Sequence, residues 1–202
     1  MHLEMIMTAK EALQKLKEGN ARYMKLTHSN GDISPEIRKR TWLYGQHPYA
    51  IIITCSDSRV IPEAIFDANM GDLFVIRLAG NVIDAHQLGS IEYAAGHLGC
   101  PLIVVLGHTH CGAVDAAINH DPEGFIKFIT DEIRLAIGDT KDPHEGCIRN
   151  VNHSLSLIQH SLEIRHVEEE HHMAAIGAVY DLESGVVEFL PMLQVGEEPV
   201  EE

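Results

Sequence analysis

The sequence predicts an α/β fold in which a mostly parallel central sheet is flanked by helices. Three short apolar runs, at residues 49–54, 73–78 and 102–106, are rich in β-branched side chains and bounded by Gly or Pro. Such nearly continuous runs are typical of strands buried on both faces. Segments with helical spacing separate them, and this alternation favours a layered fold with right-handed crossovers. We therefore expect the three runs to be parallel strands of one sheet.

Local signals predict the remaining elements. Thr8 and Glu11 have the spacing of a capping box, so a helix is expected to begin there, with Leu13, Leu16 and Met24 near one stripe. A loop is expected at 29–34, and a polar, turn-rich stretch at 121–145. Further helices are expected at 35–44, 63–70, 87–99, 111–119 and about 149–170. Residues 174–191 have the pattern strand, turn, strand, which predicts a hairpin closing one edge of the sheet.

Length and composition indicate a single domain spanning residues 1–202. Of the 202 residues, 45% are hydrophobic and 22% charged, which is enough to build a core. The formal net charge of −15 disfavours binding to nucleic acid or to an anionic membrane surface. No run approaches the roughly 20 apolar residues of a membrane span, and the first residues lack the apolar stretch of a secretory signal. Four cysteines are too few for a secreted disulfide scaffold, so we expect a cytoplasmic protein.

Two groups of reactive side chains follow the first and third predicted strands. The segment CSDSR begins at Cys55, and the segment HTHCG begins at His108. Ligands of open α/β sheets bind beyond the carboxyl ends of the strands. Two thiolates and an imidazole suit Zn²⁺, and catalytic zinc sites use three protein ligands and keep one position open. We therefore hypothesise an open zinc site, one ion per chain, formed by Cys55, His108 and Cys111.

Other interpretations of these residues stay open at this point. Cys55 and Cys111 are also compatible with buried core cysteines or with a disulfide, and His108 with a core histidine. Asp57, beside an open zinc site, has two possible roles, as a metal ligand or as a proton acceptor. An ion pair with Arg59 would keep the carboxylate ionised and directed away from the metal, which favours the second role.

These motifs resemble those of the β-class carbonic anhydrases, in which a Cys-x-Asp-x-Arg segment is followed by His-x-x-Cys. Both patterns are complete here, at 55–59 and 108–111, and the likeness runs from about residue 9 to residue 190. The resemblance implies zinc-dependent, reversible hydration of carbon dioxide to bicarbonate and a proton, by attack of a zinc-bound hydroxide.

The resemblance also implies a role for individual residues. Cys55, His108 and Cys111 would bind zinc, and Asp57, paired with Arg59, would orient the hydroxide. The implied substrate pocket has three parts. Gln46 is the polar anchor, Phe74, Ala79 and Tyr93 form the apolar wall, and Gly112 contributes a backbone N–H.

The implied partner is a second copy of this chain. Members of the family form obligate dimers, often tetramers, with active sites at the subunit boundary. By the same resemblance, an N-terminal helical arm at about residues 8–45 would clasp the other subunit.

One position departs from part of the family. One branch has a second, inhibitory bicarbonate site that uses a Trp three residues before the first zinc cysteine. Here that residue is Ile52, and the only Trp is Trp42. We therefore predict no such allosteric site, and an Asp57–Arg59 pair that is formed in the resting state, as in the plant-like branch. Two alternatives to CO₂ hydration are hydrolysis of CS₂ or COS on the same fold, and a non-catalytic homologue that binds zinc or bicarbonate.

Overall fold

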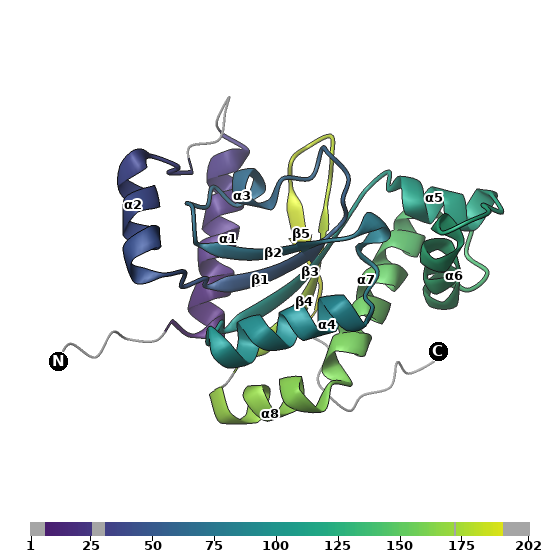
Figure 1. Cartoon of the computed structure of the whole chain (residues 1–202). Helices are drawn as coiled ribbons and strands as arrows, with labels where there is room; N and C mark the ends of the chain where they lie inside the picture. The colour runs from purple at the N-terminus through teal and green to yellow at the C-terminus, as the bar shows by residue number, and fades with distance from the viewer. Residues whose placement is uncertain (1–6, 26–30, 172, 192–202) are drawn as a thin grey trace.

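The central element is a five-stranded sheet with helices on both faces (Figure 1). The computed structural model describes residues 7–25, 31–171 and 173–191. The strand order is β2-β1-β3-β4-β5; the first four strands are parallel, and β5 is antiparallel to β4. The predicted mostly parallel sheet with an edge hairpin is thereby confirmed. The strands are β1 (Ala50–Thr54), β2 (Leu73–Arg77), β3 (Leu102–His108), β4 (Ala174–Tyr180) and β5 (Val187–Phe189).

Helices cover the two faces and one end of the sheet. They are α1 (Ala9–Tyr23), α2 (Pro35–Tyr44), α3 (Pro62–Ile65), α4 (Ala85–Glu92), α5 (Gly112–Asn119), α6 (Ile126–Ile137), α7 (Pro143–Gln159) and α8 (Leu162–His171), with two short helical turns, η1 (Ala79–Asn81) and η2 (Tyr93–His97). In Figure 1, α1 crosses behind the strands, α4 crosses in front, and α5 and α6 lie beyond the end of the sheet.

β1 and β3 form the buried centre of the sheet because their side chains are apolar on both faces. Every residue of these two strands is buried. Ile52 and its alternate neighbours pack into a hydrophobic cluster with α1 and α3, whereas Ile51 and Ile53 pack into a second cluster with α4, α7 and α8. A third cluster, at the carboxyl end of β1, joins α5 and α6 to Cys55 and Cys111. The ends of the central strands are thus enclosed by helices.

The stretch at 121–145 differs from the prediction, because it contains α6 and the first turn of α7. The core face of α6 consists of Thr130, Ile133 and Ile137, which are buried at helical spacing. Ile133 and Ile137 are apolar, but charged residues lie between the three positions, so the segment has a polar composition and its helix was not predicted. The predicted helix at 149–170 is in fact two helices, separated where the Ser161 hydroxyl accepts a hydrogen bond from the Ile164 N–H (3.2 Å).

Smaller differences concern helix lengths. The region predicted as a helix at 63–70 is helical only in α3, and the region at 87–99 is α4 followed by the π-helical turn η2. The capping box of Thr8 and Glu11 is present, but Met24 lies at the exposed end of α1 rather than in the core. Residues 29 and 30 of the predicted loop lie outside the described residues. Within the described part of the chain, no helix is long and apolar enough to cross a membrane.

Candidate metal centre

The three predicted ligands converge at the carboxyl ends of the two central strands. Cys55 directly follows β1, His108 is the last residue of β3, and Cys111 is the N-cap residue of α5. Because β1 and β3 are parallel neighbours, their ends meet at the same edge of the sheet. The sulfur atoms and an imidazole nitrogen lie within 4.8 Å of one another, and all three side chains are buried. This spacing allows one small ion to contact all three.

The two neighbouring thiols affect each other's ionisation, and their pKa values move in opposite directions. A hydrogen bond with Cys111 is the largest cause that lowers the pKa of Cys55, and backbone N–H groups of Gly80 (3.2 Å) and Asp57 (3.4 Å) also donate to its sulfur. The pKa of Cys111 is raised, because it donates to Cys55 and is buried. Both cysteines are free of disulfides. Full ionisation of the pair therefore requires a cation, and a divalent metal ion would supply that charge.

The imidazole of His108 is oriented for metal binding. Its Nδ1 lies 2.9 Å from the carbonyl oxygen of Thr109, which can only accept, so Nδ1 carries the hydrogen. Nε2 then presents a lone pair, and within the described part of the chain it is buried without a hydrogen-bond partner. Such an orphaned acceptor costs about 1–3 kcal/mol. The chemistry of the donor set therefore fits Zn²⁺, which prefers thiolate and imidazole ligands.

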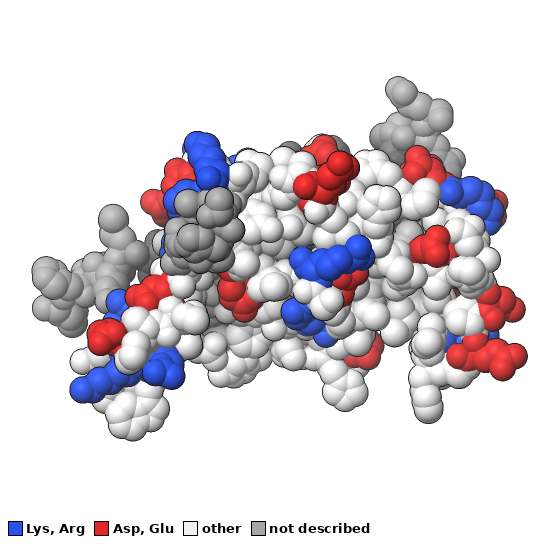
Figure 2. Space-filling view, turned by 90° about the horizontal axis from the view of Figure 1, so that it is seen from above, with Lys and Arg blue, Asp and Glu red and all other residues white. Residues whose placement is uncertain are grey.

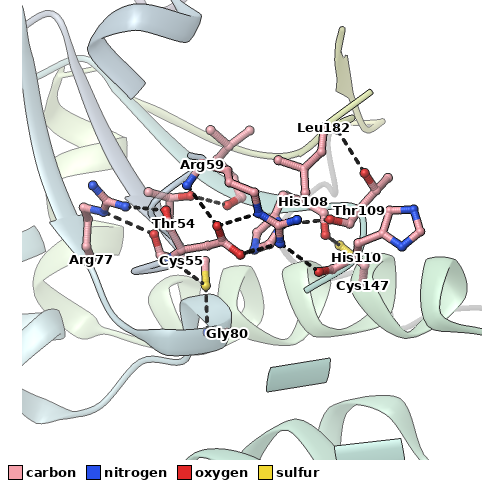
Figure 3. A network of polar contacts seen from close by, with 12 residues as sticks. Thr54, Cys55, Arg59, Arg77, Gly80, His108, Thr109, His110, Cys147 and Leu182 are labelled. Atoms are coloured by element: carbon pink, nitrogen blue, oxygen red, sulfur yellow. Dashed lines mark hydrogen bonds and ion pairs between the residues drawn. The ribbon is translucent and has the colours of Figure 1, made fainter. Parts of the chain in front are cut away.

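Asp57 lies beside this cluster but is engaged by Arg59. The Arg59 guanidinium donates to both carboxylate oxygens (3.0 and 2.7 Å), and the Arg59 backbone N–H donates to one of them (2.9 Å). These bonds hold the pKa of Asp57 well below its usual range. Arg59 also donates to the carbonyl oxygen of His110 (3.3 Å), a residue with a left-handed backbone (φ 54°). The pair thus connects the two loops that carry the candidate ligands (Figure 3).

Arg77 is a site residue that the sequence analysis missed. It ends β2 next to Thr54 of β1, and its guanidinium donates to the carbonyl oxygens of Cys55 (3.2 Å) and Asp57 (2.7 Å). One side chain therefore fixes the backbone on both sides of Ser56. A signal was present in the sequence, because a charged residue ends an otherwise apolar strand run beside the CSDSR segment.

The residues predicted to line the substrate pocket fall into two groups. Ala79 and Gly112 lie near the ligands, since Ala79 precedes Gly80 and Gly112 follows Cys111. Phe74 instead pairs with Ile51, which is four residues and about 13 Å along the strand from Cys55.

Tyr93 and Gln46 lie with Phe74 at the amino ends of the strands. The Tyr93 ring is 6.3 Å from the Phe74 ring between centroids, and the exposed Gln46 precedes the start of β1. Within one chain, these three residues therefore do not share the pocket with the cysteines.

Comparison with known proteins agrees with this geometry. A family model described as carbonic anhydrase matches residues 50–187. The chain is 37% identical over 190 residues to the carbonic anhydrase of Mycolicibacterium smegmatis, covering 88% of this chain and 91% of that protein. It is 45% identical over 131 residues to carbonic anhydrase 2 of Mycobacterium tuberculosis, covering 62% and 63%.

Solved structures show the same relationship. The β-carbonic anhydrase CafA of Aspergillus fumigatus matches with a TM-score of 0.72 and 28% identity, over 92% of this chain and 91% of that chain. One of two tetrameric β-carbonic anhydrases from Sordaria macrospora matches with a TM-score of 0.70 and 26% identity, over 77% and 87%. On the strength of the family match and the shared fold, this chain belongs to the β class of the carbonic anhydrases.

Proposed function

We propose that this chain is a zinc enzyme that converts CO₂ and water reversibly to bicarbonate and a proton. The observation that supports the proposal most directly is the buried Cys55–His108–Cys111 cluster, with an orphaned imidazole nitrogen, beside an ionised carboxylate. Zinc in such a site supplies a water molecule acidic enough to react at neutral pH.

The residues around the cluster have distinct tasks in this proposal. Cys55 and Cys111 provide two negative charges, and His108 provides a neutral nitrogen. Asp57 accepts a hydrogen bond from the attacking water and fixes its direction, while Arg59 keeps the carboxylate ionised. The backbone N–H of Gly112, at the start of α5, is available to an oxygen atom of the substrate. CO₂ is small and apolar, so these anchors and an apolar wall are sufficient.

We propose further that Gln46, Phe74 and Tyr93 reach the substrate pocket from a second copy of the chain, whereas Ala79 belongs to the same chain as the ligands. Gln46, Phe74 and Tyr93 lie at the amino ends of the strands, and the cysteines lie at the carboxyl ends. These three residues reach a metal centre only if another subunit presents them. The tetrameric relative from Sordaria macrospora shows that proteins of this fold assemble. We therefore propose a homodimer as the active unit, which can pair into a tetramer.

The surface of α2 supports this assembly. Of its ten residues only Ile37 is buried, and Trp42 and Tyr44 are 79% and 73% exposed. Residues 1–45 carry eight Lys or Arg against five Asp or Glu, whereas residues 46–202 carry seven against 25. In Figure 2 the end that holds α2 carries Lys and Arg side chains beside acidic ones, whereas the opposite end is mostly acidic. An arm with apolar and basic side chains is suited to an acidic partner.

Two finer proposals concern regulation and location. Ile52 is fully buried in the cluster beneath α1, which leaves no polar group there for a second bicarbonate, and the Asp57–Arg59 pair is already formed. We therefore propose that the chain belongs to the plant-like branch without that allosteric site. A cytoplasmic location fits two ligand thiols that must stay reduced.

The test measures the rate of CO₂ hydration by stopped flow for the purified protein and for the Asp57→Ala variant, each with its zinc content determined. Fast hydration that requires zinc and collapses in the variant is the expected result. One zinc per chain without hydration, at neutral and mildly alkaline pH, would overturn CO₂ as the substrate. Assays with CS₂ and COS would then separate a hydrolase from a non-catalytic zinc or bicarbonate binder.

A further inference from the structure

The turn η1 supplies a hydrogen bond to a candidate metal ligand. The Gly80 N–H donates to the sulfur of Cys55 at 3.2 Å. Gly80 and Asn81 both have left-handed backbones, with φ of 65° and 45°. A Cβ atom at Gly80 would lie 2.6 Å from Cδ1 of Ile133 and 3.0 Å from Cβ of Ala113, so the turn also needs a glycine for space. The direction of this N–H thus depends on an unusual backbone conformation.

Two side chains of α7 stabilise that conformation by hydrogen bonds to the turn. Nδ2 of Asn150 donates to the carbonyl oxygen of Gly80 at 2.7 Å, and the hydroxyl of Ser154 donates to the carbonyl oxygen of Asn81 at 3.0 Å. Asn150 and Ser154 are four residues apart, so they lie on one face of the helix. Each is only 1% exposed. Consecutive carbonyls of the turn therefore accept from consecutive turns of α7.

Asn150 keeps this contact at a cost to the fold. Its Oδ1 is buried and has no hydrogen-bond partner within the described part of the chain. An unpartnered buried acceptor is unfavourable, and an apolar side chain at this position would avoid it. A residue that is needed only to pack α7 against the turn would not require an amide. The presence of an asparagine at position 150 is explained by its Nδ2 group, which donates to the carbonyl oxygen of Gly80.

We propose that Asn150 and Ser154 are positioning residues of the metal centre, which act on Cys55 through the Gly80 N–H. By fixing the peptide that follows Gly80, they restrict the left-handed glycine and so keep its own N–H directed at the sulfur. An N–H···S bond stabilises the thiolate and reduces the charge that the sulfur donates to a metal. This inference rests on the proposed zinc site.

The test compares Asn150→Ala and Ser154→Ala with control variants of the same helix. Asn152→Ala and Ser156→Ala are matched in chemistry and lie two residues further along, on another side of α7. Zinc affinity at neutral pH is measured by competition with a chelator, and the cobalt-substituted proteins are compared by the energy of the thiolate-to-cobalt absorption band. Thermal unfolding of the metal-free proteins is measured in parallel.

We expect both test variants to bind zinc more weakly, Asn150→Ala by roughly 10- to 100-fold, because the Gly80 N–H no longer holds the Cys55 sulfur in position among the three candidate ligands. Their cobalt band is expected to move to lower energy because the sulfur is richer in charge, and both controls should match the unmodified protein. A lower melting temperature with unchanged affinity and band energy would overturn the inference, since it indicates packing alone. If Asn150→Ala does not fold, Ser154→Ala decides, because it removes a single oxygen atom. Failure of the unmodified protein to bind zinc would instead overturn the proposed function.

Discussion

The carboxylate of Asp57 and the guanidinium of Arg59 form a two-pronged pair, with Oδ1 accepting from Nε at 3.0 Å and Oδ2 accepting from Nη2 at 2.7 Å. The same Oδ2 lies 4.0 Å from Nε2 of His108. The carboxylate is therefore next to the candidate metal ligands while its charge is already paired. This arrangement favours a hydrogen-bond acceptor over a fourth ligand, and it makes the roles of the pair separable by substitution.

Asp57→Asn should abolish most of the catalysis without removing the metal. The amide keeps the shape of the side chain but lacks the negative charge that accepts the hydrogen bond of the attacking water and pairs with Arg59, so kcat/KM for CO₂ is expected to fall by roughly 10²- to 10⁴-fold. Zinc content should stay at one per chain, because the ligand cluster does not include Asp57. Ser58→Ala, at the exposed residue next to Asp57, is the control and should keep activity near that of the unmodified protein. Loss of zinc together with activity would show that Asp57 is a ligand instead.

Arg59→Ala should change how stability depends on pH. Arg59 lowers the pKa of Asp57, so the pair stabilises the fold fully above the ordinary carboxyl pKa of about 4; this contribution begins to be lost as pH falls past that value and is gone below the lowered pKa. Without the Arg59 side chain, the backbone N–H of residue 59 still donates to Asp57, but the largest cause of the lowered pKa is gone, so this contribution is smaller. Urea unfolding of the metal-free proteins between pH 5 and pH 3 should therefore show the steeper loss of stability in the unmodified protein. Parallel curves for the two proteins would contradict this account.

Removal of zinc should lower thermal stability through the Cys–His–Cys cluster. A ligand present at a free concentration about 1,000 times its dissociation constant stabilises the native state by about 4 kcal/mol. For a chain of this size, this raises the melting temperature by roughly 8–16 °C. Calorimetry with and without a chelator measures the shift. Cys111→Ser should unfold at one temperature under both conditions, whereas Cys100→Ser, which alters a buried cysteine at the other end of β3, should keep the shift.

The sequence predicted the strands and the convergence of Cys55, His108 and Cys111 because both depend on local signals. An apolar run such as 49–54 can be assigned as a strand without knowing which strand pairs with it. Residues that follow neighbouring parallel strands then lie at the same edge of the sheet. Helix α6 was missed because its core face is a narrow stripe between charged residues, and only packing against α5 and α7 reveals it. The hydrogen bond from Asn150 to Gly80 spans 70 residues of the chain, a separation that no local pattern encodes.

Strand direction contained more information than the sequence analysis used. Phe74 is near the start of its strand and Cys55 follows the end of the parallel neighbour, so the two belong to opposite edges of the sheet. That reasoning separates the predicted pocket residues into two groups before any contact is known. It also leads to a prediction about which subunit provides each group.

A mixed dimer of two impaired chains should recover activity. If Gln46 serves the metal centre of the other subunit, a heterodimer of Asp57→Ala and Gln46→Ala chains has one site in which both residues are intact and one in which both are altered. Co-expression with two different tags allows that heterodimer to be purified, and its CO₂ hydration rate should reach about half that of the unmodified dimer, above either variant homodimer. The two variant homodimers, purified in the same way, are the controls. A heterodimer no faster than the mean of the two homodimers would show that Gln46 and Asp57 act within one chain, and the proposed assignment of the pocket wall to the second subunit would then be wrong.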